Sequence, residues 1–188
     1  MNETIRNEFK EHLKVANLFE NLIGGVQLSA ELCIDCLRNG GKILIFGNGG
    51  SAADAQHIAA ELVGKYKTDR KGLSAIALTT DTSSLTSIGN DFGYEHVFDR
   101  QIEALAKKGD VVIGISTSGK SDNVISALKL ASKLNCASIG FSGDNGGEMN
   151  EICDVNLIVP SKNTPRIQEM HIIIGHTICH LIDQEFKF

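Results

Sequence analysis

A cluster of hydroxyl side chains follows a strand-like apolar run in the segment Val111–Ser121, which reads VVIGISTSGKS. A helical pattern, SDNVISALKLASKL, begins at the end of this segment. The first backbone N–H groups of a helix have no partner inside the helix, and the helix dipole favours negative charge there. Four hydroxyls and a glycine at such a position predict a site for a phosphate dianion, formed by Ser116, Thr117, Ser118 and Ser121.

Two nucleotide-binding patterns also match the chain, and both are weak. Gly114–Ser121 fits G-x-x-x-x-G-K-[ST], but its middle positions hold Ile and hydroxyl residues, and only Asp81 could supply a magnesium-binding acid at a strand end. Gly47–Ala52 fits G-x-G-x-x-A, but the acid expected about 20 residues later falls at Asp69, in a charged loop. Glycine and hydroxyls at a strand-to-helix turn suit any phosphate, so the phosphate need not belong to a nucleotide.

Two helical segments carry residues that could bind a metal or transfer protons. His57 and Glu61 are four residues apart and therefore share one helix face, and Gln168 and His176 lie eight residues apart on the last helix. Two imidazoles, a carboxylate and an amide oxygen could hold a divalent metal such as zinc. A His-x-x-x-Glu pair by itself is also typical of a surface salt bridge, so both interpretations stay open at this point.

Composition and charge are those of a globular domain without a nucleic-acid or membrane partner. The chain has 188 residues, 42% of them hydrophobic and 22% charged, as in an ordinary globular domain. A net charge of −5 argues against a nucleic-acid partner, and no apolar run reaches the length of a membrane span. The first residues lack a signal-peptide core, and five cysteines, an odd number, suggest reduced thiols in the cytoplasm. Cys33 and Cys36 fall inside a helical pattern, where we expect plain packing.

The elements that must position these residues alternate between strand and helix. The first 40 residues predict two helices, one over Ile5–Ile23 and one ending near Asn39, and Pro160 and Pro165 bracket a loop. Strands are predicted at Lys42–Phe46, Ser74–Leu78, Val111–Ile115, Ala137–Phe141 and Val155–Val159. Further helices are predicted at Ser51–Tyr66 and Arg166–Glu185, and Thr82–Ala106 is predicted to be mainly helical with a break near GNDFG.

This alternation predicts an α/β fold, a three-layer sandwich with a five-stranded parallel sheet flanked by helices. We expect one domain over residues 1–188, with an α/β core at 41–188 and N-terminal helices at 1–40 that make oligomer contacts. Binding sites in such sheets lie beyond the carboxyl ends of the strands. The segments GNGGS, TTDTSS and STSGKS all fall at those ends.

Four blocks of the chain resemble one known family. GNGGSAADAQHIAAEL, GNDFGYEHVF, GISTSGKSDNV and RIQEMHIIIGH are similar to the SIS phosphosugar-binding family, and more closely to its phosphoheptose isomerases, over nearly the whole chain. The resemblance implies a homotetramer with sites between subunits, one zinc ion per subunit and no nucleic-acid or membrane partner. The implied reaction converts D-sedoheptulose 7-phosphate to D-glycero-D-manno-heptose 7-phosphate, for ADP-heptose and the lipopolysaccharide core or other surface polysaccharide.

The resemblance also implies roles for individual residues. The sugar phosphate would contact Glu61 and Gln168 and the residues that match the family's binding blocks, which are Asn48, Gly49, Gly50, Asn90, Asp91, Ser116, Thr117, Ser118 and Ser121. The implied zinc ligands are His57, Glu61, Gln168 and His176, and the implied catalytic pair is Glu61 and His176. Some members carry an aspartate just before the RIQE block, where this chain has Pro165.

The implied chemistry moves a proton from C1 of the ketose to C2 through an enediol. Glu61 is the expected base, because a carboxylate can bind a metal through one oxygen and take a proton on the other. His176 is the expected opposing acid or base, although a metal-bound nitrogen is not free for proton transfer. The alternatives are a regulator of the same family that binds a replication initiator, an isomerase of another sugar phosphate, and, more distantly, a nucleotide-dependent phosphotransferase.

Overall fold

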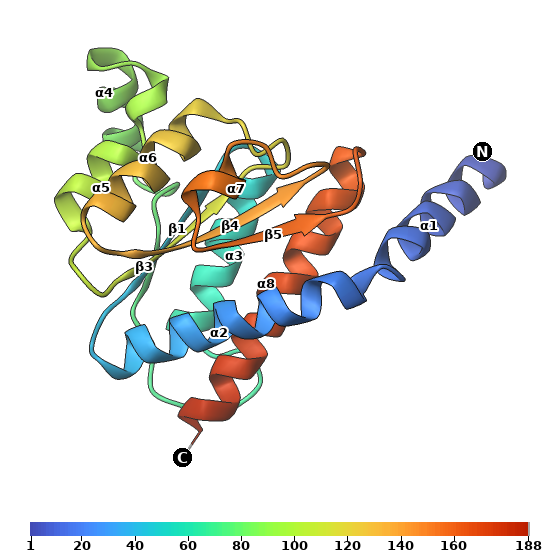
Figure 1. Cartoon of the computed structure of the whole chain (residues 1–188), viewed down its shortest axis with the longest axis horizontal. Coiled ribbons are helices and arrows are strands. Elements are labelled where there is room, and N and C mark those ends of the chain that lie inside the picture. The colour runs from blue at the N-terminus through green and yellow to red at the C-terminus, as the bar shows by residue number, and fades with distance from the viewer. Residues whose placement is uncertain (188) are drawn as a thin grey trace.

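A five-stranded parallel sheet forms the centre of the molecule, in the strand order β2-β1-β3-β4-β5. The structure, a computed structural model, describes residues 1–187 (Figure 1). All neighbouring strands pair in parallel, which confirms the predicted α/β sheet. The strands are β1 (Ile43–Gly47), β2 (Ala75–Ala77), β3 (Val111–Ile115), β4 (Ala137–Gly143) and β5 (Val155–Val159).

Helices cover both faces of this sheet. The α-helices are α1 (Asn2–Ala16), α2 (Ile23–Arg38), α3 (Gly50–Val63), α4 (Thr82–Asp91), α5 (Asp99–Leu105), α6 (Asp122–Lys133), α7 (Met149–Ile152) and α8 (Thr164–Phe186). Two short 3₁₀ helices, η1 (Phe19–Leu22) and η2 (Tyr94–His96), join longer elements. Figure 1 shows α1 extending away from the sheet at the N-terminal end.

Alternating side chains of β1 divide the core into two layers. Ile43 and Ile45 lie in the cluster that also holds buried residues of α2, α3 and α8. Leu44 and Phe46 lie in the cluster that holds residues of α5 and α6. Successive side chains of a strand point to opposite faces, so a strand that is apolar throughout requires cover on both. This arrangement confirms the three-layer sandwich.

The predicted helix over Ile5–Ile23 is wrong at its C-terminal end. α1 ends at Ala16, and the chain tightens into η1 before α2 begins at Ile23. After the break, α2 packs closely on the sheet, because a Cβ on Gly25 would lie 2.5 Å from the side chain of Leu157 on β5.

A loop lies between Pro160 and Pro165 as predicted, but α8 begins at Thr164, two residues before the predicted start at Arg166. Pro165 occupies the first turn of α8, where a missing N–H costs no hydrogen bond. Cys33 and Cys36 are buried in α2, as expected for packing, and burial raises the pKa of Cys36 to about 11. Within residues 1–187, no helix is both long and apolar enough to cross a bilayer.

Candidate active site

The turn after β1 brings together residues that the sequence placed in separate blocks. Asn48 follows β1 directly, and Gly49 adopts φ +56°, a conformation that favours glycine, before α3 begins at Gly50. The Asn48 amide forms two hydrogen bonds with the amide of Asn123 at the start of α6, each 2.9 Å long. The Tyr94 hydroxyl donates to the Asn48 oxygen over 3.2 Å.

Asn123 and Tyr94 were missed by the sequence analysis. Both lie inside blocks that resemble the family, GISTSGKSDNV and GNDFGYEHVF, but their side chains match no motif for chemistry. Asn123 is buried, although it is polar and lies in the first turn of a helix. That burial depends on its pairing with a residue 75 positions away, which a sequence pattern does not report.

The hydroxyl turn after β3 has the compact form expected of an anion site. The Ser116 and Ser121 hydroxyls are 2.9 Å apart, and those of Ser116 and Ser118 are 3.4 Å apart. The backbone N–H of Ser121, at the N-cap of α6, donates to the Ser116 hydroxyl over 3.4 Å. Gly119 has φ +65°, and a Cβ there would lie 2.1 Å from the carbonyl oxygen of Gly146. Three of the four predicted hydroxyls therefore converge at the N-terminus of α6.

A polar cavity of about 200 Å³ adjoins this turn. Thr117 and Ser118 line it, together with Lys120 and Lys162. The Lys162 ammonium also lies 3.8 Å from the Asp144 carboxylate. Asp144 also lines the cavity, so its carboxylate offsets part of the positive charge that the two lysines bring to the hydroxyl turn. The position of Lys162 beside the turn was not apparent from the sequence, because it lies 41 residues after Ser121.

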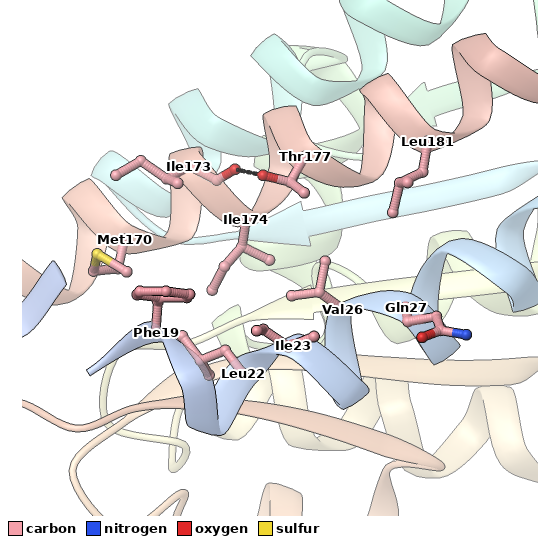
Figure 2. Close-up of a pocket in the computed structure, with 10 residues that line it drawn as sticks. All are labelled: Phe19, Leu22, Ile23, Val26, Gln27, Met170, Ile173, Ile174, Thr177 and Leu181. Carbon is pink, nitrogen blue, oxygen red and sulfur yellow. Dashed lines mark hydrogen bonds between the residues drawn. The ribbon is translucent and has the colours of Figure 1, made fainter. Parts of the chain in front are cut away.

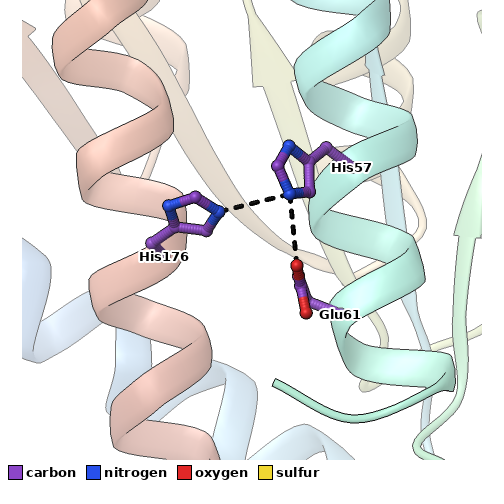
Figure 3. A group of neighbouring side chains, drawn as sticks. All are labelled: His57, Glu61 and His176. Carbon is purple, nitrogen blue, oxygen red and sulfur yellow. Dashed lines mark hydrogen bonds and ion pairs between the residues drawn. The ribbon is translucent and has the colours of Figure 1, made fainter. Parts of the chain in front are cut away.

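His57, Glu61 and His176 converge from two helices (Figure 3). His57 Nε2 lies 3.1 Å from Glu61 Oε1 and 3.3 Å from His176 Nε2. One ligand atom from each residue lies within 4.8 Å of both others. Donor atoms on a tetrahedral zinc ion are about 3.3–3.4 Å apart, given zinc–nitrogen bonds of about 2.0–2.1 Å. The donor set and its spacing therefore fit a zinc ion, and His176 joins the i, i+4 pair of His57 and Glu61.

The other predicted site residues do not join the His57–Glu61–His176 cluster. Gln168 packs on the first residue of α3, because a Cβ on Gly50 would lie 2.5 Å from Gln168 Nε2. Asn90 and Asp91 end α4, where both are exposed and the Asn90 amide donates to the Asp91 carboxylate over 2.8 Å. Their contacts with metal or substrate stay predictions.

His171 has a structural environment on the same helix as His176. It is fully buried in α8, and its Nε2 lies 3.0 Å from the carbonyl oxygen of Ser142. Burial lowers the pKa of His171 to about 4, an effect that the hydrogen bond to Ser142 only partly offsets. His171 is therefore a neutral core residue, whereas His57 and Glu61 reach solvent with 48% and 22% of their side chains exposed.

An apolar groove of about 640 Å³ lies away from these polar groups (Figure 2). It runs between η1 and α2 on one side and α8 on the other, and its lining includes Phe19, Ile23, Met170, Ile173 and Leu181. Such a lining offers no group for acid–base chemistry or anion binding. The hydroxyl turn and the His57–Glu61–His176 cluster therefore form the candidate active site.

Comparisons with known proteins agree with this geometry. A family model described as "SIS domain" matches residues 9–143. The phosphoheptose isomerase of Aliarcobacter butzleri is 60% identical over 188 residues, which cover all of both chains. A phosphoheptose isomerase of Campylobacter jejuni is 59% identical over 97% of this chain and 98% of its own. The solved phosphoheptose isomerase of Neisseria gonorrhoeae is 47% identical with a TM-score of 0.92, covering 97% of this chain and 98% of that one. By these likenesses, the chain belongs to the SIS domain family and, within it, to the phosphoheptose isomerases.

Proposed function

We propose that this sugar-phosphate isomerase converts D-sedoheptulose 7-phosphate to D-glycero-D-manno-heptose 7-phosphate. One observation carries the proposal: a compact hydroxyl turn and a His57–Glu61–His176 cluster occur in one chain that is 60% identical to a phosphoheptose isomerase over its whole length.

The residues of this chain would divide the work of an aldose–ketose isomerisation. Ser116, Ser118 and Ser121 would hold the phosphate and so position the reacting carbons. The Glu61 carboxylate would take the proton from C1 and return it to C2 of the enediolate, while a proton moves from O1 to O2. His176 is the candidate for that second transfer when its nitrogen is free, and a ligand otherwise.

The metal site would be formed by His57, Glu61 and His176, with Gln168 as the proposed fourth ligand. A zinc ion held there, one per subunit, would polarise the substrate carbonyl as a Lewis acid. The support is the nitrogen and oxygen donor set and its spacing, with ligand atoms within 4.8 Å of one another.

Removal of the metal is expected to lower kcat by roughly 100-fold or more, because carbonyl polarisation contributes several kcal/mol to such reactions. The measurement is turnover after dialysis against a zinc chelator, with the metal content determined on the same sample. Added Zn²⁺ should restore the rate, and added Mg²⁺, which prefers oxygen ligands in an octahedron, should not. Full activity in metal-free protein would contradict the proposed site.

Replacing Ser118 and Ser121 together by Ala is expected to raise KM by roughly 100-fold, with a smaller change in kcat. Each hydroxyl would donate to a charged phosphate, and such a bond contributes about 1.5–3 kcal/mol. Ser132→Ala is the control, because Ser132 is exposed in the last turn of the same helix, α6. An unchanged KM in the double variant would contradict the assignment of Ser118 and Ser121 to phosphate binding.

The family resemblance also supports a homotetramer in the cytoplasm. Ile5, Phe9 and Leu13 of α1 form an apolar stripe with more than half of each residue exposed, at 52%, 68% and 58%. The apolar groove of Figure 2 is a second surface of the same kind, and copies of the chain could cover both. The cytoplasmic location is supported by five cysteines that are all free thiols within residues 1–187.

Incubation with sedoheptulose 7-phosphate and detection of the aldose 7-phosphate tests the proposed function directly. Ketose phosphates of five and six carbons belong in the same panel, since a faster reaction with one of them would reassign the substrate. No turnover of any sugar phosphate, with binding retained, would favour the regulatory alternative within the family. A nucleotide-dependent phosphotransferase would have to bind ATP. Because the match of Gly114–Ser121 to the nucleotide-binding pattern is weak, we expect no ATP binding.

A further inference from the structure

The segment that follows α3 is attached to α8 by a buried carboxylate. We call residues 64–73 the strap. Asp183 of α8 accepts hydrogen bonds from the backbone N–H groups of Lys67 and Thr68, at 2.7 and 2.9 Å, through one oxygen. Its other oxygen lies 2.6 Å from Nε of Arg70. Both side chains of this ion pair are completely buried, at 0% exposure.

The Arg70 guanidinium also binds the C-terminal turn of α3. Nη2 donates to the carbonyl oxygen of Glu61 and Nη1 to that of Leu62, each over 2.9 Å. The last four carbonyl groups of a helix have no partner inside the helix, and a cation is favourable at that end. Arg70 therefore holds the backbone of Glu61, whose side chain belongs to the candidate metal site.

The same ion pair is also linked to His176, the third residue of the candidate metal site. Asp183 follows His176 by seven residues, about two helical turns, so both project from similar sides of α8. Tyr66 of the strap stacks on the His176 ring, with centroids 5.4 Å apart and planes at 26°. One buried pair thus connects the α3 backbone at Glu61, the strap and the helix that carries His176.

We propose that Asp183 and Arg70 are positioning residues that set the placement of α3 against α8, so that His57, Glu61 and His176 converge. That the cluster binds a metal rests on the proposed function. That Asp183 and Arg70 hold the cluster in place rests on the contacts described above. A buried ion pair adds little net stability over apolar residues of the same volume, because both charges lose their hydration. Because its hydrogen bonds require particular distances and directions, such a pair can fix the position of one helix relative to another.

Asp183→Asn is expected to weaken Zn²⁺ binding by about 10–100-fold, the usual effect of losing a group that orients metal ligands. An amide keeps the shape of the carboxylate, but its NH₂ must face either the strap N–H groups or the Arg70 guanidinium. The measurement is competition for Zn²⁺ with a chromogenic chelator, using the full chain. Arg70→Lys keeps the charge but cannot reach two α3 carbonyls together, so it should weaken binding in the same direction.

Asp110→Asn is the matched control. Asp110 is 3% exposed and also accepts two backbone N–H groups, those of Lys42 and Lys107, while the Lys42 ammonium lies 2.5 Å from its carboxylate. It precedes β3, at the amino end of the sheet. Zinc affinity should therefore stay within twofold of the unchanged protein, and an equal loss in both variants would overturn the positioning role.

A second readout needs neither metal nor turnover. The Hε1 resonance of His176 should lie upfield in metal-free protein labelled at histidine ¹³Cε1, because the Tyr66 ring covers it, and His176→Gln identifies it. Asp183→Asn should move this resonance toward the position of free histidine, and Asp110→Asn should leave it in place. An unmoved resonance in folded Asp183→Asn would overturn the inference. If the unchanged protein bound no zinc, the proposed metal site would fail, and the resonance would still decide the role of Asp183.

Discussion

Glu61→Gln is expected to lower kcat by about 1,000-fold, within the range attributed to a positioned general base. The amide has nearly the shape of the carboxylate and keeps one oxygen, but it cannot accept the C1 proton. Sugar-phosphate binding should persist, because the phosphate would be held by the separate hydroxyl turn at Ser116, Ser118 and Ser121.

Deuterium exchange separates this role of Glu61 from a loss of metal. In D₂O, the unchanged protein should exchange hydrogen at C1 of the ketose, and Glu61→Gln should not, in samples matched for zinc content. Glu31→Gln is the control, since Glu31 is exposed on α2, where it accepts a hydrogen bond from the Gln27 amide over 2.8 Å. Rapid turnover by Glu61→Gln with zinc bound would assign the base to another group.

Arg70→Met is expected to lower the free energy of unfolding by about 3–5 kcal/mol, the usual cost of removing one partner from a buried ion pair. Asp183 would remain charged and buried, and the carbonyls at the end of α3 would lose their donors. Urea unfolding of metal-free protein measures the change. Arg38→Met, which breaks the half-exposed pair between Arg38 and Glu185, should cost less than about 1 kcal/mol. Equal losses would contradict this account.

The pH dependence of the Arg70→Met effect follows from the pKa of Asp183. Burial favours the protonated carboxyl, but the Lys67 and Thr68 N–H groups and the Arg70 guanidinium outweigh it, so the pKa lies below its ordinary value. A lowered pKa in the folded state adds stability above the unfolded pKa of about 3.9, and this stability is lost as the pH falls through the folded value. Without Arg70, burial raises the pKa of Asp183 in the folded variant, so the difference between Arg70→Met and the unchanged protein should be largest above that raised pKa and shrink as the pH falls through it toward the lowered pKa of the unchanged protein.

The sheet could be predicted from the sequence because its strands are short and largely apolar. Val111–Ile115, a central strand, and Val155–Val159, an edge strand that contains Asn156, have the predicted bounds. The break after Ala16 escaped prediction because η1 itself carries apolar residues that continue the helical pattern. The close approach of α2 to β5 at Gly25 is a tertiary contact that the helical pattern does not report either.

In the candidate site too, local groups could be predicted from the sequence and long-range contacts could not. Ser116, Ser118 and Ser121 converge within one turn, and His57 and Glu61 within one helix, so spacing alone could indicate them. The pairs that hold these groups in place join residues far apart in the chain. Arg70 and Asp183 are 113 positions apart, and no periodicity or motif links them.

The pairing of Asn48 limits what that side chain can recognise. Its amide oxygen already accepts from both Asn123 and Tyr94, which fills its two lone pairs. Its nitrogen donates once to Asn123, so a single hydrogen is left. A sugar can therefore meet Asn48 only with an oxygen that accepts, and a hydroxyl there must turn its own hydrogen elsewhere. Discrimination between sugar stereoisomers at this turn would then depend on the direction of one lone pair.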